Sequence, residues 1–392
     1  MSETWPYIDS DAVSSLVKII ESGNWNYWVG DEGRLFEREF ADYLGVSFGI
    51  ALSNGTVALE LALRVLDIGP GDEVIVTCRS FMASASCIVQ RGAIAVFCDV
   101  EYETGNINPD EVAQLITEKT KAIVCVHLGG APCDMDSIKT LANKHGLFII
   151  EDCAQAHGAE YRNKKVGSFG DVAAFSFCQD KIMTTLGEGG FLATNNERLF
   201  EKAWAFKDHG KNKEKMAIAS EPYRFKWVHD SFGSNLRLPE LQSALGRLQL
   251  ANLDNWIHKR NENAQSFNTV VESTLGDQVV VVPDRLMDTK GIRHAKYKHY
   301  VYLGEEIVRD VPSLKMKVLE YCCRLGVRAF HGSCSNLSRE ACFATSSNHI
   351  VPRKLEMAER LDKVAIAFEV HPNKTKTSVE RDALILCEAI FK

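Results

Sequence analysis

Four polar segments follow strand-like apolar runs in this chain, and each holds residue types that can do chemistry. In the first, Asn54, Gly55 and Thr56 come directly before a helix-like segment. Glycine lets a backbone approach a ligand closely, and the N-terminus of a helix favours an anion such as phosphate. An ordinary capped turn has the same residues, so this segment alone identifies nothing.

The second and third segments offer a carboxylate and a hydroxyl. Asp152 follows Glu151 at the end of an apolar run, where burial would favour a cationic partner such as a protonated pyridine nitrogen. Ser176 stands between Phe175 and Phe177. The alternatives are a structural carboxylate that caps the next segment and a core serine bonded to a neighbouring carbonyl.

The fourth segment contains Lys181 and the glycine-rich run 187–190. A lysine in desolvating surroundings has a lowered pKa and can act as an amine nucleophile. Taken singly, Lys181 would be interpreted as a solvated surface residue. The glycine-rich run matches neither GxGxxG nor the lysine-containing phosphate loop of nucleotide hydrolases, so it indicates only a tight turn beside a ligand.

The elements that carry these segments alternate between strand and helix from about residue 48 to 210. Strands are expected at 48–52, 73–77, 95–100, 121–128, 147–152, 172–177 and 190–194. Helices are expected at 57–66, 82–91, 109–117, 136–145 and 197–207. Continuously apolar strands between helices predict an α/β fold, with a mostly parallel sheet sandwiched by helices. Such sheets bind ligands outside the carboxyl ends of their strands, which is where all four segments fall.

Together the four segments supply a phosphate cradle, a partner for a pyridine nitrogen, a further phosphate hydroxyl and a lysine able to form a Schiff base. These are the groups that pyridoxal phosphate (PLP) requires from a protein. The sequence therefore predicts a PLP site in which Lys181 holds the cofactor.

The rest of the chain is expected to form a smaller α+β domain. Residues 211–230 are polar and basic, which indicates an exposed loop, and 239–267 have the periodicity of one long helix. Further strands are expected at 279–282 and 300–303, and helices at 312–325 and 379–391, the last capped by Ser378. We assign 31–238 to a large PLP-binding domain, and 1–30 with 239–392 to the smaller domain.

Composition and charge fit a cytoplasmic enzyme. The chain has 392 residues and a formal net charge of −7, which argues against a nucleic-acid or anionic-membrane partner. The N-terminus lacks the pattern of a signal peptide, and no apolar run is long enough to span a bilayer. Twelve scattered cysteines indicate a reducing compartment. The histidines show no HxxxH or HxH spacing, so no metal site is predicted.

In their order the motifs resemble those of the DegT/DnrJ/EryC1/StrS family, sugar aminotransferases with the PLP transferase fold type I. The resemblance is dense over residues 20–265 and loose elsewhere. The matching stretches are Phe36–Phe40 with Tyr43–Gly45, Ser53–Thr56, Gly69–Val76, Asp134–Asp136, Glu151–Ala159, Gly167–Asp171, Phe175–Phe177 through Lys181 to Gly190, and Asn235–Arg237 with Glu240–Gln242.

The resemblance implies roles for the central residues. Lys181 falls on the lysine that holds PLP as a Schiff base and then moves protons. Asp152 falls on the carboxylate that keeps the pyridine nitrogen protonated, and Gln155 on the residue near the ring hydroxyl. The resemblance places phosphate contacts at Asn54, Gly55, Thr56 and Ser176.

Two further positions concern the ring and the partner subunit. Phe81 occupies the position of the aromatic residue that stacks on the ring. Asn235 matches an asparagine that reaches the phosphate from the partner subunit, which implies a homodimer with shared active sites.

The implied reaction is a ping-pong transfer of an amino group from glutamate to a keto sugar. The sugar would be linked to a nucleotide diphosphate and be of the 4-keto-6-deoxy or 3-keto type, in a pathway for lipopolysaccharide O-antigen or a natural product. Aromatic residues between Trp25 and Gly30 could contact it, although core packing explains them equally well.

Three alternatives stay open. A PLP-dependent sugar dehydratase of the same family would carry histidine in place of Lys181. A cyclitol aminotransferase would use the same cofactor on another ring. A non-catalytic regulatory homologue would keep the fold and a ligand.

Some positions depart from the commonest family pattern. Leu186 stands where glycine is commoner, so we expect ordinary backbone angles there. Gly233–Asn235 lacks a tyrosine before the asparagine, and residues 331–336 differ in a way that leaves the substrate open. His294 and Lys298 could meet an acidic ligand, but we expect them to be exposed.

Overall fold

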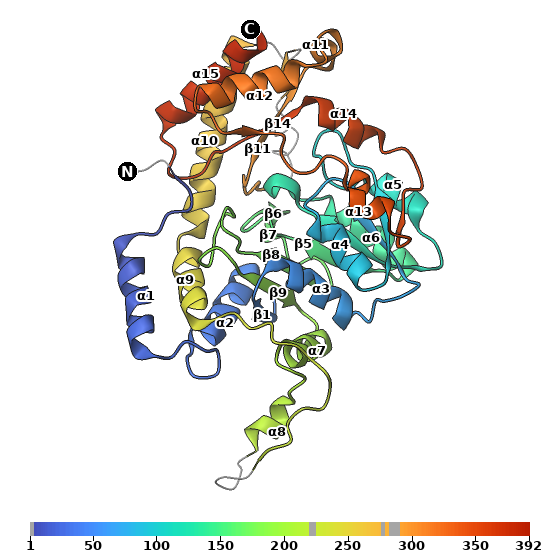
Figure 1. The fold of residues 1–392 in the computed structure, drawn as a ribbon, viewed down its shortest axis with the longest axis vertical. Coiled ribbons are helices and arrows are strands. Elements are labelled where there is room, and N and C mark those ends of the chain that lie inside the picture. The colour runs from blue at the N-terminus through green and yellow to red at the C-terminus, as the bar shows by residue number, and fades with distance from the viewer. Residues whose placement is uncertain (1–3, 219–224, 276–278, 282–290) are drawn as a thin grey trace.

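A single large sheet runs through the middle of the molecule. The computed structural model describes residues 4–218, 225–275, 279–281 and 291–392. Within them the strand order of this sheet is β1-β9-β8-β5-β4-β2-β3-β13 (Figure 1). Among these described strands β9 alone runs opposite to the others, which confirms the mostly parallel sheet. The strands are β1 (Phe48–Leu52), β2 (Glu73–Thr77), β3 (Ile94–Cys98), β4 (Thr120–Val126), β5 (Phe148–Asp152), β8 (Val172–Ser176), β9 (Gly190–Thr194) and β13 (His349–Ile350).

Helices cover both faces of this sheet, because both sets of alternating strand side chains are apolar. Val74 and Val76 of β2 belong to one core with α3 and α4, whereas Ile75 belongs to a second core with α2 and α6. Burial on two faces explains why these strands are continuous apolar runs. The flanking helices are α2 (Glu32–Leu44), α3 (Gly55–Val65), α4 (Ala83–Gln90), α5 (Pro109–Leu115), α6 (Met135–His145) and α7 (Glu197–Lys207).

The C-terminal part forms a smaller α+β unit around a second sheet. Its strands are antiparallel, in the order β10-β11-β14-β12. They are β10 (Val280–Val281), β11 (His299–Leu303), β12 (Ala329–Phe330) and β14 (Ala365–Phe368). The helices of this part are α10 (Leu253–Thr274), α11 (Glu305–Asp310), α12 (Leu314–Arg324), α14 (Glu356–Val364) and α15 (Lys376–Ile390). In Figure 1, α10 runs from the large sheet to this unit.

Shorter elements complete the described chain. They are α1 (Ser10–Ser22), α8 (Lys213–Ala217), α9 (Glu240–Leu250), α13 (Ala341–Ala344), the hairpin of β6 (Glu160–Tyr161) and β7 (Lys164–Lys165), and the 3-10 turns Leu128–Gly130 and Leu337–Arg339. α1 packs against α9, and β13 joins the large sheet beside β3. The division into 31–238 and the two flanking segments remains a prediction. No helix among the described residues has both the length and the apolar character that crossing a membrane requires.

Three details of the sequence-based assignment were wrong. The helix expected at 239–267 is two helices, because the side-chain amide of Asn252 donates to the Leu248 carbonyl and the chain turns there. Thr375, rather than Ser378, caps α15 and accepts from the Ser378 backbone N–H at 3.1 Å. The exposed loop expected at 211–230 contains α8 in its described part, and residues 219–224 lie outside the described residues.

Candidate active site

A cavity of about 590 Å³ opens at the carboxyl ends of β1, β5 and β8. Eight of the nine residues singled out from the sequence line it: Asn54, Gly55, Thr56, Phe81, Asp152, Gln155, Ser176 and Lys181. The ninth, Asn235, is exposed and pairs with Asp208 through a backbone bridge. The parallel sheet thus brings together residues that are up to 127 positions apart, counted from Asn54 to Lys181.

The first corner of the cavity is built by β1 and α3. The side chain of Asn54 caps α3 by accepting from the Val57 backbone N–H at 3.0 Å. A Cβ atom on Gly55 would lie 2.6 Å from the Cβ of Ser176, so only glycine lets the start of α3 approach the end of β8 this closely. The free N–H groups of the helix start and the Ser176 hydroxyl fit a phosphate group.

The carboxylate of Asp152 lies deep in the cavity. It accepts from the Ser84 hydroxyl at 2.7 Å and from the Ala154 backbone N–H at 3.1 Å. The Ser84 hydroxyl is itself 2.7 Å from that of Ser80. Burial raises the pKa of Asp152, because desolvation outweighs its two hydrogen bonds and the more distant charge of Lys181. A protonated pyridine nitrogen in direct contact would stabilise the carboxylate, so the residues present fit the ring of PLP.

Its neighbour Glu151 points to the opposite face of the sheet, as alternation along a strand requires. Glu151 is buried and accepts from His127 at 3.1 Å and from the backbone N–H groups of Gly167, Phe169 and Gly170. These bonds outweigh its burial, and its pKa is lowered. Glu151 therefore stabilises the loop between β7 and β8, and of this pair Asp152 is the one that lines the cavity.

Gln155 is held in one orientation. Its side-chain oxygen accepts from the Gly129 backbone N–H at 2.7 Å, which leaves its amide nitrogen facing the cavity, 3.4 Å from the Ser333 hydroxyl. A fixed N–H donor at this place can bind a phenolic oxygen of a ring seated on Asp152.

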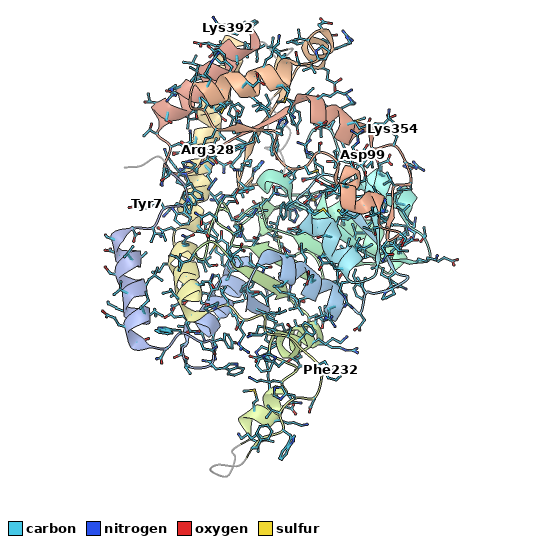
Figure 2. All side chains as sticks on the ribbon, in the orientation of Figure 1. Tyr7, Asp99, Phe232, Arg328, Lys354 and Lys392 are labelled. Atoms are coloured by element: carbon cyan, nitrogen blue, oxygen red, sulfur yellow. The ribbon has the colours of Figure 1, made fainter. Side chains whose placement is uncertain are left out.

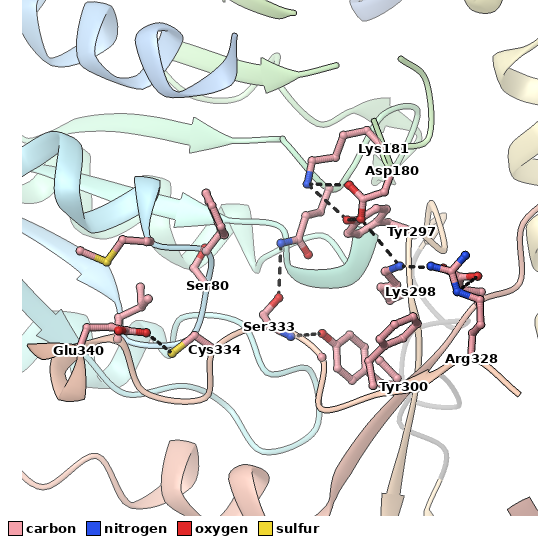
Figure 3. Close-up of a pocket in the computed structure, with 18 residues that line it drawn as sticks. Ser80, Asp180, Lys181, Tyr297, Lys298, Tyr300, Arg328, Ser333, Cys334 and Glu340 are labelled. Carbon is pink, nitrogen blue, oxygen red and sulfur yellow. Dashed lines mark hydrogen bonds and ion pairs between the residues drawn. The ribbon is translucent and has the colours of Figure 1, made fainter. Parts of the chain in front are cut away.

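Lys181 belongs to an irregular segment, the lysine loop, which we define as residues 178–189. Its side chain is 15% exposed, and its amine lies 3.4 Å from the Tyr297 hydroxyl and 3.9 Å from Asp180 (Figure 3). Side chains from far along the chain bond this loop: Trp5 donates to the Lys181 carbonyl at 2.8 Å, and Gln242 donates to the carbonyls of Thr185 and Glu188.

The turn of the lysine loop corrects one expectation. Leu186 has φ of 60°, in the left-handed region, rather than ordinary angles. The following Gly187 also has positive φ, at 97°. The turn therefore keeps a left-handed leucine, at a cost of about 1–2 kcal/mol that the surrounding bonds must offset.

A second cavity of about 480 Å³ adjoins the first on the side of the smaller unit. The two share Ser80, Phe81, Gln155, Asp180, Lys181 and Tyr297. Lys298, Arg328 and Glu369 line the second cavity only. Figure 3 shows Lys298 and Arg328 opposite Ser333 and Cys334, so polar side chains from two regions of the chain surround the space. It provides room for a substrate beside the lysine amine.

Sequence reasoning missed or misjudged three residues here. Lys298 was expected to be exposed, but its side chain is only 17% exposed and its amine lies 3.5 Å from Glu369. Its stem is covered because the amine lies over the rings of Tyr297 and Phe330. Tyr297 and Asp180 were not singled out, although Asp180 directly precedes Lys181.

Other expectations concern residues at or away from the cavities. Phe81 is 67% exposed at the mouth of both cavities, where a ring seated on Asp152 could be covered. Trp25 is exposed and Trp28 packs edge-on against Trp204. Neither tryptophan lines a described cavity beside Lys181. His294 was expected to be exposed but is partly buried, and its ring accepts a hydrogen bond from the Lys296 backbone N–H at 2.8 Å.

A large mostly parallel sheet with a lysine amine and a buried carboxylate at one edge defines a fold type I PLP enzyme. Residues 6–382 match the model of the DegT/DnrJ/EryC1/StrS aminotransferase family, and the chain belongs to this family. PLP is accordingly its cofactor, and it is a PLP-dependent aminotransferase by class.

Three relatives illustrate the match. GDP-perosamine synthase of Escherichia coli O157:H7 is 41% identical over 249 residues, which cover 63% of this chain and 65% of that enzyme. The dTDP-3-amino-3,6-dideoxy-alpha-D-galactopyranose transaminase of Aneurinibacillus thermoaerophilus is 43% identical over 64% of this chain and 65% of its own. The crystal structure of an aminotransferase from Psychrobacter cryohalolentis superimposes with a TM-score of 0.93 at 42% identity, and covers 97% of both chains.

Proposed function

We propose that this protein transfers the amino group of glutamate to a keto sugar linked to a nucleotide diphosphate, in two half-reactions. The observation that carries the proposal is the shared cavity of the Lys181 amine and the Asp152 carboxylate. Bound PLP supplies a carbonyl that condenses with amines and a ring that takes up electrons from the adjacent carbon. Amine chemistry at Lys181, in place of the histidine expected of a dehydratase, favours transfer over water elimination.

The residues of the chain divide the work. Asn54, Gly55, Thr56 and Ser176 bind the phosphate, and Asp152 holds a proton on the ring nitrogen. The Lys181 side chain is 15% exposed, and the carboxylate of Asp180 lies 3.9 Å from its amine. Once released from the cofactor, the amine would carry a proton between the two carbons that flank the transferred nitrogen. The adjoining cavity holds the sugar.

The keto sugar is assigned from the two named relatives, one of which makes a GDP-linked and the other a dTDP-linked product. Such products fit the amino sugars of lipopolysaccharide or of a natural product. All twelve cysteines are unpaired, which supports a reducing compartment such as the cytoplasm.

The test is a panel of nucleotide-linked 3-keto and 4-keto sugars incubated with glutamate, with release of 2-oxoglutarate as the measurement. Borohydride should fix PLP to Lys181, detected by mass spectrometry of the peptide. Lys181→Ala should abolish both, whereas the matched surface variant Lys202→Ala should keep both. Lys202 lies away from the cavity, and its removal breaks an ion pair with Asp67 and a hydrogen bond to the Val65 carbonyl. Turnover by Lys181→Ala at the wild-type rate would refute the assignment.

We also propose a homodimer with shared sites. The hairpin that carries α8 projects from the body of the molecule, and Figure 2 labels Phe232 on it. Phe232 is 99% exposed and Trp227 is 78% exposed, which is unusual for large apolar side chains and indicates a covered surface in the assembly. Asn235, just beyond this hairpin, is exposed and is not among the residues that line the cavity of its own chain.

Subunit complementation tests this arrangement. If Asn235 binds the phosphate of the partner's site, Asn235→Ala and Lys181→Ala are each inactive. Mixed dimers then contain one site with both lesions and one site with none, so an equal mixture recovers roughly a quarter of wild-type activity. If Asn235 served its own chain, every site of the mixture would carry one lesion and no activity would return.

A further inference from the structure

Tyr297 and Asp180 form a hydrogen-bonded pair beside Lys181, and the reaction outlined above assigns no role to either residue. The Tyr297 hydroxyl lies 2.5 Å from Asp180 Oδ2 and 3.4 Å from the Lys181 amine (Figure 3). The amine also lies over the Tyr297 ring, 4.7 Å from its centre. Tyr297 is buried, while the Asp180 side chain is 55% exposed at the cavity. The tyrosine is therefore fixed between a carboxylate and the amine.

The protons of this cluster have one consistent arrangement. Burial acts to raise the pKa of Asp180, but the Lys181 ammonium and the Tyr297 hydroxyl outweigh it, and the pKa is lowered. Burial and the Asp180 charge raise the pKa of Tyr297. Asp180 is thus ionised and Tyr297 keeps its proton, which it donates to Asp180. The lone pairs of the phenolic oxygen are left to accept an N–H of Lys181.

Other charged groups face the same cluster. Lys298, from the start of β11, lies 3.9 Å from Asp180 and 3.5 Å from Glu369. Arg260 of α10 is buried close by and interacts with Asp180 and Tyr297 through its charge. Asp152 and His157 also interact with Lys181 through its charge. Asp180 is the carboxylate that balances Lys298 and Arg260 next to the amine, so its removal would leave these two cations less compensated.

We propose that Tyr297, held by Asp180, is a positioning residue that orients the Lys181 amine, and that the Asp180 carboxylate stabilises positive charge at this place in the cavity. During the reaction the amine must reach both carbons that flank the transferred nitrogen. The lysine stem has four rotatable bonds, so it does not fix the amine by itself. A hydrogen bond to a fixed phenol restricts the amine and directs its own lone pair away from Tyr297. This inference rests on the proposed role of Lys181.

The experiment uses the PLP-loaded enzyme and two variants. Tyr297→Phe keeps the ring and removes the acceptor, so kcat should fall by about tenfold to a hundredfold while the KM for glutamate changes little. Asp180→Asn removes the charge and keeps the shape, so the pH midpoint of the absorption change of the bound cofactor should fall by about half a unit or more. Tyr161→Phe breaks a similar tyrosine–aspartate bond, 2.8 Å to Asp134, outside the cavity and is the matched control.

The outcomes separate this inference from the proposed function. Borohydride fixation of PLP on Lys181 in wild type and both variants, with a lower midpoint in Asp180→Asn and a lower kcat in Tyr297→Phe, supports the pair. The inference is overturned, and the proposed function stays intact, if PLP is fixed on Lys181 but two values match those of Tyr161→Phe. These values are the pH midpoint of Asp180→Asn and the kcat of Tyr297→Phe. Absence of fixation in wild type overturns both. If Tyr297→Phe fails to fold, the pH midpoint of cofactor absorption in Asp180→Asn still tests the inference, because Asp180 is half-exposed and its substitution disturbs packing less.

Discussion

Two sides of the cavity are built in different ways. The sheet-edge side, with Asn54, Gly55, Asp152 and Ser176, consists of residues at the ends of regular strands, and the Asn54 cap closes within three residues. The lysine loop has little regular structure of its own, and its bonds come from Trp5, Gln242 and Tyr297, up to 176 residues away.

The difference has a physical basis. A parallel sheet fixes the ends of its strands through backbone hydrogen bonds, so a polar residue placed there is positioned with little further help. An irregular loop has no such frame, and each of its carbonyls needs a partner from elsewhere or from water. We therefore expect substitutions at the sheet edge to affect cofactor binding and chemistry directly. Substitutions of the loop's anchors Gln242 and Trp5, which bond its backbone and not the lysine amine, should have smaller effects.

The largest effect is expected from Asp152→Asn, which removes the partner of the ring nitrogen. Turnover should fall by about 10²–10³-fold, because charge on the ring is no longer stabilised. Steady-state kinetics with glutamate measures this. A fall of less than threefold would show that Asp152 does not face the ring.

The same variant has a stability signature in the cofactor-free protein. Burial raises the pKa of Asp152 in the folded state, so its contribution to stability is present below the unfolded pKa of about 4 and is lost as pH rises through the folded pKa. Asn at this position does not titrate. The melting temperature of Asp152→Asn, relative to wild type, should therefore be higher at pH 8 than at pH 4. An equal difference at both pH values would contradict the buried-carboxylate account.

Gly55→Ala should have the next largest effect. The added Cβ would lie 2.6 Å from the Cβ of Ser176, so the start of α3 or the end of β8 must move. Overpacking of this kind costs about 1–3 kcal/mol, and PLP affinity should fall by about tenfold to a hundredfold. Fluorescence titration of the cofactor-free enzyme measures the affinity. Gly69→Ala is the control, because its Cβ would meet nothing nearer than 3.9 Å. Wild-type affinity in Gly55→Ala would mean that the corner is not close-packed.

The contrast between the two sides also decides what the sequence could predict. The mostly parallel sheet followed from continuous apolar runs, and Asn54, Asp152 and Ser176 were found because polar residues interrupt those runs at strand ends. The structure places these residues around one cavity with Lys181. For Lys181 itself the local signal was weak, and the ordered series of motifs was needed to single it out.

What escaped prediction depends on tertiary contacts. Tyr297 reaches Lys181 from 116 residues away, and no local pattern marks it. Lys298 was misjudged because lysines are generally exposed, whereas here its stem is covered by rings from β12 and its own neighbour. Leu186 adopts positive φ although its side chain disfavours it, because the flanking loop bonds fix the turn. Asn235 does not line the cavity of its own chain, so the structure of one subunit does not test its predicted role at the partner's phosphate.

On the loop side, Gln242→Leu should have a moderate effect. The change removes both bonds of the Gln242 amide, 2.9 Å to Thr185 and 2.7 Å to Glu188, at a net cost of about 1–2 kcal/mol in the free energy of unfolding. Because the loss is local, trypsin should cleave the cofactor-free variant, in which the Lys181 amine is free, faster after Lys181 than the cofactor-free wild type. Gln265→Leu, on the exposed face of α10, is the control. Equal cleavage rates in the two variants would show that other bonds hold the loop.

The smallest effect is expected from Trp5→Phe. Trp5 donates its indole N–H to the Lys181 carbonyl at 2.8 Å, and its ring packs edge-on against Trp256 at 5.0 Å and beneath Arg260 at 4.9 Å. Phenylalanine keeps much of this packing and removes the donor, so the loss is one hydrogen bond of about 1 kcal/mol. Since water can partly replace the donor at a half-buried site, kcat should fall by no more than about fivefold.

The control for Trp5→Phe is Trp25→Phe, because Trp25 also donates its indole N–H to a backbone carbonyl, that of Ile20 at 3.1 Å, but lies outside the described cavities beside Lys181. Only Trp5→Phe should lower kcat, and only Trp5→Phe should speed tryptic cleavage after Lys181 in the cofactor-free protein. A hundredfold loss of kcat in Trp5→Phe would mean that this N-terminal residue fixes the amine as strictly as the sheet fixes Asp152. The two sides of the cavity would then differ in where their anchors come from along the chain, and not in how tightly they are held.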